Sequence, residues 1–182
     1  MAVTDFETMQ LPMHADASND QFLHWLVQYI SWAQPSVVVE AGTFMGHFAL
    51  VCGRSAQLLD IPLHVWTCDV SDFGAAERAT QYGLTSLVTI KTQDFAAMLE
   101  EDIGLHSVDL AYIDSGPTDG VTTEPDLRWR HFNAVMPHMR KGGIILVDDT
   151  QRSANWAHKD ELRAMGVTIG TPARSITMIE AK

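Results

Sequence analysis

Cysteine, basic side chains and long apolar runs are all scarce in this chain of 182 residues. Its two cysteines, Cys52 and Cys68, stand in no CxxC or Cys/His spacing, which disfavours a zinc site or a disulfide framework and predicts two reduced core residues. The chain has only 12 Lys and Arg residues against 23 Asp and Glu residues, which gives a net charge of −11. This charge argues against nucleic acid as a partner, because phosphate backbones are bound mainly by lysine and arginine.

The apolar runs are also too short for a membrane. None approaches the roughly 20 residues that a membrane span needs, and the first 19 residues lack the basic start and apolar run of a secretion signal. The absences together predict a cytoplasmic protein that has neither nucleic acid nor a membrane as partner.

What is present is the composition of a globular protein, with 46% hydrophobic and 19% charged residues. A chain of this length buries roughly 70% of its unfolded surface as one domain. Residues 1–18 have no period and contain Pro12, so they predict an N-terminal arm or lid. Residues 19–182 are predicted to form a single domain, whose first helix would pack on its own sheet or on a second copy of the chain as a homodimer.

Short apolar runs alternate with segments of helical period along the chain. The runs predict strands at 37–39, 63–68, 87–90, 108–113 and 144–147, and the periodic segments predict helices at 21–33, 48–59, 75–82, 95–101 and 127–139. Continuous apolar strands between helices are typical of a parallel sheet covered on both faces. The last two runs, 167–170 and 174–179, are joined by only three residues and therefore predict an antiparallel hairpin. The fold class is a doubly wound α/β domain with a mostly parallel, seven-stranded sheet.

An acidic residue ends every predicted parallel strand. Ligands of open α/β sheets bind beyond the carboxyl ends of the strands, near the point where the strand order reverses. We therefore expect the functional site among these acids, which are Glu40, Asp69, Asp94, Asp114, Asp148 and Asp149.

The stretch VVVEAGTFMGH at 37–47 combines an acid with a glycine loop. Gly42 and Gly46 would let the backbone turn sharply and approach a ligand, with a helix beginning near His47. A dinucleotide loop would read GxGxxG, whereas this one reads ExGxxxG, and Glu40 would repel a pyrophosphate but attract an ammonium and a sulfonium. Asp69 ends the next strand at about the spacing, roughly 20 residues on, from which an acid reaches ribose hydroxyls. A positive sulfur joined to a nucleoside describes S-adenosylmethionine.

Five segments in order carry a family resemblance, from about residue 34 to the C-terminus: EAGTFMG, TCDV, KTQD, DLAYID and MRKGGIILVDD. With them the chain resembles the class I S-adenosylmethionine-dependent methyltransferases, and within these the small O-methyltransferases of the catechol and natural-product-tailoring type. The resemblance implies a Rossmann-like methyltransferase fold with S-adenosyl-L-methionine as cofactor. It implies contacts to the methionine part from the glycine loop, to the ribose from the second strand and to the adenine from the third.

The cofactor-binding residues that this resemblance implies are Glu40, Gly42, Thr43, Phe44, Gly46, Asp69, Val70, Gln93, Asp94 and Asp114. Two plainer interpretations stay open. The glycines would equally suit an ordinary tight turn, and Asp94 would equally suit a helix cap.

Asp114, Asp148 and Asp149 would meet at the ends of neighbouring strands. Without a cation, three close carboxylates repel one another, and oxygen ligands suit Mg²⁺ or another divalent cation. The resemblance also implies a divalent ion at an aspartate and an aspartate pair. The alternative is that Asp148 and Asp149 cap the following helix while Asp114 orients a loop.

The predicted catalytic residues are His47 and Asp114. Methyl transfer to a hydroxyl needs alignment of the acceptor and removal of its proton. The catechol-type enzymes have a lysine shortly after the fourth-strand aspartate, and this chain has none in the sequence SGPTD at 115–119. The general base therefore stays open among the histidines, of which His47, His131 and His158 lie nearest the predicted site.

The sequence thus predicts a methyltransferase that O-methylates a small hydroxylated metabolite, with help from a divalent metal if the three aspartates hold one. A catalytically silent S-adenosylmethionine-binding protein is the alternative that the missing lysine suggests. An NAD-dependent oxidoreductase would share the architecture but is disfavoured by Glu40 and by the glycine spacing.

Overall fold

The computed structural model describes residues 21–116, 127–150, 158–171 and 174–182. The predicted arm at 1–18 and most of the loop after the fourth strand lie outside these ranges. None of the helices in the described ranges is long and apolar enough to cross a membrane.

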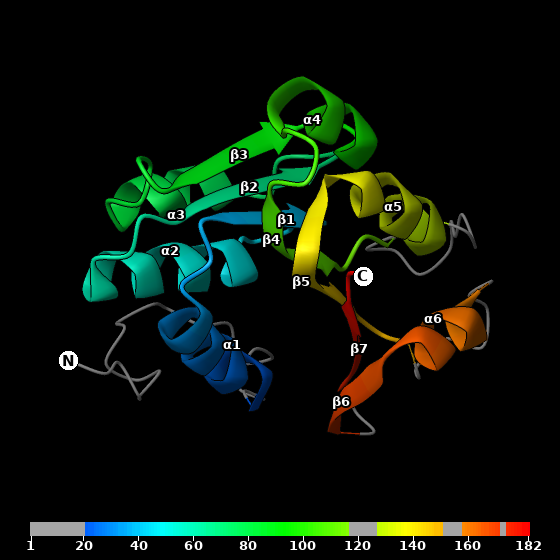
Figure 1. The fold of residues 1–182 in the computed structure, drawn as a ribbon. Coiled ribbons are helices and arrows are strands. Elements are labelled where there is room, and N and C mark those ends of the chain that lie inside the picture. The colour runs from blue at the N-terminus through cyan, green and yellow to red at the C-terminus, as the bar shows by residue number, and fades with distance from the viewer. Residues whose placement is uncertain (1–20, 117–126, 151–157, 172–173) are drawn as a thin grey trace.

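A seven-stranded sheet in the order β3-β2-β1-β4-β5-β7-β6 forms the centre of the molecule (Figure 1). The pairs β1–β2, β2–β3, β1–β4 and β4–β5 are parallel, whereas β7 is antiparallel to both β5 and β6. The predicted doubly wound sheet and its C-terminal hairpin are therefore confirmed. The strands are β1 Val37–Ala41, β2 His64–Asp69, β3 Val88–Thr92, β4 Val108–Ile113, β5 Met139–Val147, β6 Val167–Thr171 and β7 Arg174–Glu180.

Helices cover both faces of this sheet. In Figure 1, α1 and α2 lie below the parallel strands and α4 and α5 lie above them. Two apolar clusters fill the spaces between helices and sheet, one around Leu26 and Ile30 of α1 and the other around Met98 and Leu99 of α4. The helices are α1 Gln21–Ala33, α2 His47–Leu59, α3 Ala75–Gln81, α4 Phe95–Asp102, α5 Leu127–Val135 and α6 Lys159–Met165.

The central strand β4 is buried along its whole length, although it contains Asp109. That carboxylate accepts hydrogen bonds from the amides of Ser36 and Val37 at 2.6 and 2.9 Å and pairs with Arg140 at 2.5 Å. A buried charge is tolerated when it is paired and hydrogen-bonded in this way. Asp109 thereby ties β4 to the start of β1, and the two strands end side by side at the switch point of the sheet.

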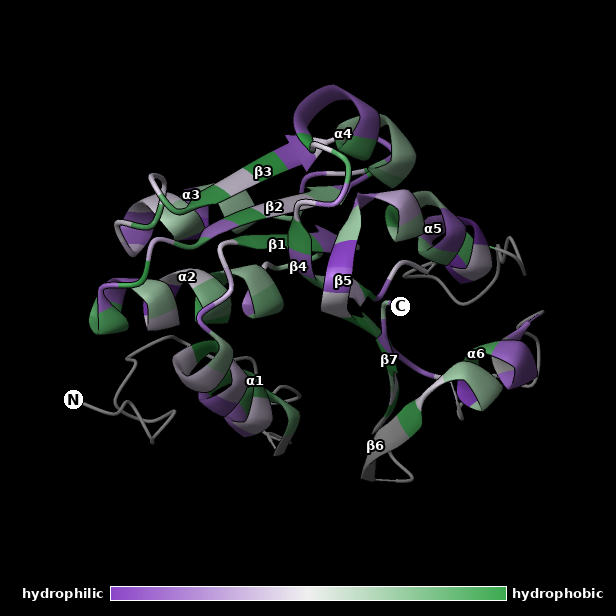
Figure 2. Cartoon of the chain, viewed as in Figure 1, coloured by the Kyte–Doolittle hydropathy of each residue, from purple (hydrophilic) through white to green (hydrophobic). Residues whose placement is uncertain are grey.

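The segment around Pro137 differs from the prediction. The predicted helix 127–139 ends at Val135 and is followed by the short 3-10 helix η3 Met136–His138, because proline lacks an amide donor and its ring disrupts a continuing helix. β5 begins at Met139 rather than at 144, and its first residues include exposed Arg140 and Lys141, visible as a purple band in Figure 2. A strand that begins with polar residues is invisible to a search for apolar runs.

Candidate functional site

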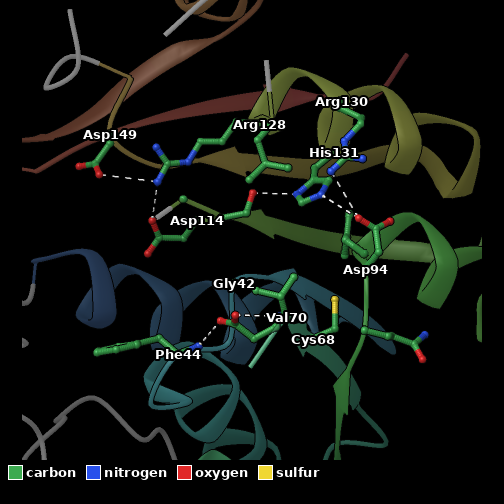
Figure 3. Close-up of a pocket in the computed structure, with 16 residues that line it drawn as sticks. Gly42, Phe44, Cys68, Val70, Asp94, Asp114, Arg128, Arg130, His131 and Asp149 are labelled. Carbon is green, nitrogen blue, oxygen red and sulfur yellow. Dashed lines mark hydrogen bonds and ion pairs between the residues drawn. The ribbon is translucent and has the colours of Figure 1, made fainter. Parts of the chain in front are cut away.

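A cavity of about 400 Å³ opens at the carboxyl ends of β1, β2 and β4, where the sheet order reverses (Figure 3). This is the place where ligands bind in open α/β sheets. Many of the residues predicted to bind a cofactor line it, namely Gly42, Phe44, Asp69, Val70, Gln93, Asp94 and Asp114.

A second cavity of about 80 Å³ adjoins the first one. Gly42, Phe44 and Asp114 belong to the walls of both cavities. Glu40 and His47 line the smaller cavity only, as do Thr43, Tyr112 and residues of α1. Of the predicted site residues near the glycine loop, Gly46 lines neither cavity and lies instead at the start of α2.

The glycine loop has the conformation that its sequence requires. Gly42 has φ +96°, and a Cβ atom there would lie 2.7 Å from the carbonyl oxygen of Asp114, so only glycine fits where the end of β4 passes. Gly46 has φ +83° and precedes the first residue of α2. Phe44 lies between them with φ +44°, a region that bulky residues rarely adopt, and its amide donates to Asp69 at 2.9 Å. The loop is therefore a tight turn whose backbone passes close to the end of β4 and forms part of the cavity wall.

Glu40 is a buried acid, with 2% of its surface exposed. The hydroxyl of Thr67 donates to its carboxylate at 2.5 Å, and the hydroxyl of Thr43 lies 2.6 Å from that of Thr67. Burial raises the pKa of Glu40 well above its ordinary value, against the opposing hydrogen bond from Thr67, and the carboxylates of Asp114 and Asp69 raise it further. Among the described residues, no basic side chain pairs with this acid. A cationic ligand group would therefore be stabilised here.

Asp69 is the last residue of β2 and is held by two backbone amides. Its carboxylate accepts from Phe44 at 2.9 Å and from Val70 at 2.8 Å, and these bonds fix its orientation at the edge of the larger cavity. Val70 is 79% exposed and offers an apolar surface beside it. Gln93 also lines the larger cavity, and its side-chain amide donates to Glu101 of α4 at 3.5 Å. A carboxylate with free lone pairs next to an apolar side chain suits a ribose joined to a base.

Asp94 is the helix cap that was one of its two predicted roles, and its position also leaves the predicted cofactor contact open. Its side chain accepts from the Ala96 amide at 2.9 Å and so caps α4, and it also lines the larger cavity. Arg130 lies 3.4 Å from its second oxygen.

His131 lies on the α5 side of the same cavity and is 5% exposed. Its Nδ1 is 2.7 Å from the Ser115 hydroxyl, and its ring contacts Phe95 with 5.2 Å between ring centroids. Burial lowers the pKa of His131 to about 4, although Asp94 nearby raises it, so the imidazole is neutral at physiological pH. His131 is therefore a neutral polar group in the cavity wall.

The three aspartates of the predicted metal site are engaged by other residues of the chain. Asp148 is buried and accepts from the Tyr112 hydroxyl at 2.5 Å and from the Asp149 amide at 2.7 Å. Between Asp114 and Asp149 lies the guanidinium of Arg128, whose Nη2 is 3.0 Å from Asp114 and 3.7 Å from Asp149 (Figure 3). The described residues contain no group of three or more acidic, histidine or cysteine side chains that could hold a metal ion. These residues do not fit a divalent cation.

The predicted catalytic residues lie in different walls. Asp114 is shared by both cavities, whereas His47 faces the smaller one, beside Glu40. The third candidate histidine, His158, stacks on Trp129 with 4.7 Å between ring centroids.

Two polar residues of the site were missed by the sequence interpretation, Arg128 and Tyr112. A tyrosine inside an otherwise apolar strand is a usable signal, because a buried hydroxyl needs a partner. An arginine on a helix carries no such signal, because most arginines there point to solvent.

Comparison with solved structures places the chain among methyltransferases by fold. A Klebsiella pneumoniae protein proposed to be an O-methyltransferase matches with a TM-score of 0.69 and 17% identity, over 97% of this chain and 86% of that one. The O-methyltransferase TomG from Streptomyces achromogenes, in complex with S-adenosylmethionine, matches with a TM-score of 0.64 and 15% identity, over 94% and 82% of the two chains. The S-adenosylhomocysteine-bound methyltransferase PaMTH1 from Podospora anserina gives a TM-score of 0.65 and 15% identity, over 93% and 83%.

No curated protein matches the sequence. A family model described as a methyltransferase domain matches residues 39–150, which is more than half of the chain and contains the glycine loop and every predicted site acid. The chain therefore belongs to the methyltransferase domain family and is an S-adenosylmethionine-dependent methyltransferase.

Proposed function

We propose that this methyltransferase acts on an oxygen atom of a small hydroxylated metabolite. The observation that carries the proposal is the pair of adjoining cavities with Asp114 in their common wall. A group in that wall can contact an acceptor placed at the junction. The similar folds of TomG, described as an O-methyltransferase, and of the Klebsiella protein proposed to be one, support oxygen as the methylated atom.

The cofactor fits the charges of the site. Glu40 would hold its ammonium, Asp69 its ribose hydroxyls, and Val70 with Asp94 its base. S-adenosylmethionine supplies a methyl group on a positively charged sulfur. Hydrogen bonds within the chain orient the carboxylates of Glu40, Asp69 and Asp94, so little rearrangement is needed on binding.

The chain's own residues then have two tasks. The acceptor hydroxyl must be aligned and must lose its proton as the new bond forms. Asp114 is oriented by Arg128 at 3.0 Å and lies 3.3 Å from the Tyr112 hydroxyl, so its carboxylate is a fixed acceptor for a hydroxyl hydrogen. His47 lines the smaller cavity together with Glu40 and Phe44.

The direct test is binding followed by turnover. Calorimetric titration is expected to show binding of S-adenosylmethionine and none of NAD. Tritium from the labelled methyl group should then appear in at least one member of a panel of phenols, catechols and aliphatic hydroxy compounds, with a methoxy signal in the NMR spectrum of the product. Tight cofactor binding without transfer to any acceptor would support the catalytically silent alternative, and a product methylated only at nitrogen or sulfur would refute the choice of oxygen.

A further inference from the structure

Arg128 is a buried arginine in an acidic part of the site. It is the second residue of α5, and 6% of its surface is exposed. Its side chain reaches from the helix to the ends of β4 and β5 and forms part of the wall of the larger cavity (Figure 3). An arginine is almost never this buried unless it is paired with an acid.

The partners of Arg128 are two of the carboxylates that the sequence assigned to a metal. One guanidinium nitrogen lies within 4 Å of both Asp114 and Asp149. Arginine stays protonated at neutral pH in proteins, so the guanidinium between these carboxylates carries a full positive charge. The positive charge that these carboxylates require is thus supplied by the chain itself.

The third predicted ligand does not reach the cavity. Asp148 is 3% exposed, is absent from the cavity wall, and uses its two oxygens for the Tyr112 hydroxyl and the Asp149 amide. A divalent ion such as Ca²⁺ or Mg²⁺ takes about six or more oxygen ligands in a defined geometry. To bind here, the ion would have to expel Arg128 from its buried position and break the Tyr112 hydrogen bond.

We infer that Arg128 is the resident cation of this site, so that the methyltransferase neither binds nor needs a divalent metal at Asp114, Asp148 and Asp149. Arg128 is a positioning residue: it neutralises Asp114 and Asp149 and fixes the Asp114 carboxylate toward the acceptor. Only the last clause depends on the proposed function. The charge replacement itself can be tested without any substrate.

The first measurement is a Mn²⁺ titration of the wild-type protein, followed by electron paramagnetic resonance of the free ion. We expect no binding up to about 1 mM, the weak end of the range for protein calcium sites. We also expect S-adenosylmethionine affinity, and turnover where an acceptor is known, to be unchanged by EDTA. One Mn²⁺ bound per wild-type chain, and lost in Asp114→Asn, would overturn the inference.

The second measurement removes the internal cation. Arg128→Met has a side chain of similar length without charge, and it leaves two carboxylates uncompensated. In EDTA its melting temperature should fall by about 10 °C, because loss of one partner of a buried ion pair is strongly destabilising. Mn²⁺ should restore part of this loss and bind at least about tenfold more tightly than to wild type, since the carboxylates are then available as ligands. A folded Arg128→Met that binds no more Mn²⁺ than wild type would refute the role of Arg128.

Arg130→Met is the matched control. Arg130 lies on the same helix and lines the same cavity, but it is half exposed and its ion pair is with the partly exposed Asp94. Its replacement should change the melting temperature little and create no Mn²⁺ site, because exposed pairs contribute weakly. If Arg128→Met does not fold, Arg128→Lys keeps the charge and is expected to fold and to exclude Mn²⁺, while Mn²⁺ binding by this variant would count against the inference.

The two proposals fail in different ways. If no acceptor is methylated, the proposed function is refuted, but the expected Mn²⁺ titration results and the inference about Arg128 are unaffected. Mn²⁺ binding by a wild-type protein that still methylates hydroxyl groups would refute the inference about Arg128 alone.

Discussion

A single imidazole in the cavity wall makes the stability of this protein sensitive to acid. His131 is buried between Ser115 and Phe95, and its pKa is lowered from an ordinary 6.5 to about 4 by that burial. In the unfolded chain the ring takes up a proton at a higher pH than in the folded chain. Between these two values the unfolded state binds more protons, so the free energy of unfolding decreases as the pH falls below about 6.5.

We therefore expect acid to destabilise the wild type more than a variant without this ring. One pKa unit corresponds to about 1.4 kcal/mol, so the His131 contribution to unfolding free energy should fall by about 2 kcal/mol between pH 7 and pH 5. Urea unfolding at both pH values measures this difference for wild type and for His131→Gln, whose loss should be smaller by that amount.

The exposed His106 provides the control for this measurement. His106→Gln should keep the full wild-type loss on acidification. Equal losses in the wild type and in His131→Gln would show that the buried ring is not the group that titrates.

At the scale of elements, the glycine loop between β1 and α2 joins the fold to the site. Its Gly42 passes so close to the end of β4 that a Cβ atom would lie 2.7 Å from the carbonyl oxygen and 2.9 Å from the next amide nitrogen. A side chain at this position would therefore displace the loop or the strand end, and both form walls of the two cavities. A change at this residue should affect both stability and ligand binding.

Gly42→Ala is expected to lower the free energy of unfolding by about 2 to 3 kcal/mol, because a left-handed conformation costs a residue with a Cβ about 1 to 2 kcal/mol and the strand end must also shift. Affinity for S-adenosylmethionine should fall at least about tenfold, since the walls of both cavities move. Denaturant unfolding and calorimetry measure the two effects.

Gly83→Ala is the control that separates the cost of a strained backbone conformation from the cost of a close contact. Gly83 also has a positive φ, of +66°, but no atom lies within 4 Å of the position of its Cβ. It should lose about 1 kcal/mol and leave cofactor affinity unchanged. If Gly42→Ala costs no more than Gly83→Ala, close packing against the strand end is not what requires the glycine.

Elements with strong periodicity could be predicted from the sequence, and elements whose boundaries depend on tertiary contacts could not. The helix Gln21–Ala33 and the strand Val108–Ile113 have the predicted ends, because apolar spacing and flanking residues mark them. The beginning of β5 is held by the pairing of Met139 with Val108 of β4, before an irregularity in the register, and by hydrogen bonds of Gly142 and Gly143 with Ala181, and no local pattern encodes these contacts. Tertiary pairing decided this boundary.

The same division holds for the site. The acids at strand ends could be located because the topology alone brings carboxyl ends to one edge of the sheet. Which of these acids face the cavity could not be predicted, because this depends on two other side chains. Tyr112 engages Asp148, and Arg128 lies between Asp114 and Asp149. These two side chains come from a strand and from a distant helix, and no spacing in the sequence links them to the aspartates.

At the scale of the whole molecule, folding and the proposed cofactor contact favour opposite protonation states of Glu40, because burial favours the neutral acid and a bound cation favours the carboxylate. The folded protein raises the pKa of this carboxyl by burying it, so the neutral form is favoured and the stability that it contributes is lost as the pH rises above about 4.5 and through the raised pKa. A bound cation would reverse this, because it stabilises the ionised form. The protein without cofactor is therefore less stable at alkaline pH than its core would allow.

Glu40→Gln should separate the two demands. Without cofactor, the variant is expected to be at least as stable as the wild type at pH 8, because glutamine keeps the shape of the neutral acid and can still accept from Thr67. With S-adenosylmethionine at about 100 times its dissociation constant, the wild type should gain about 2.7 kcal/mol, or roughly 5 to 10 °C in melting temperature for a chain of this size. At the same cofactor concentration the variant should gain clearly less, since it lacks the charge that we propose holds the ammonium. Thermal unfolding with and without the cofactor measures both quantities, with NAD as the ligand that should stabilise neither protein. An equal gain in the two proteins would mean that the buried acid does not contact the cofactor, and a variant that is less stable without cofactor would mean that the acid is needed for folding.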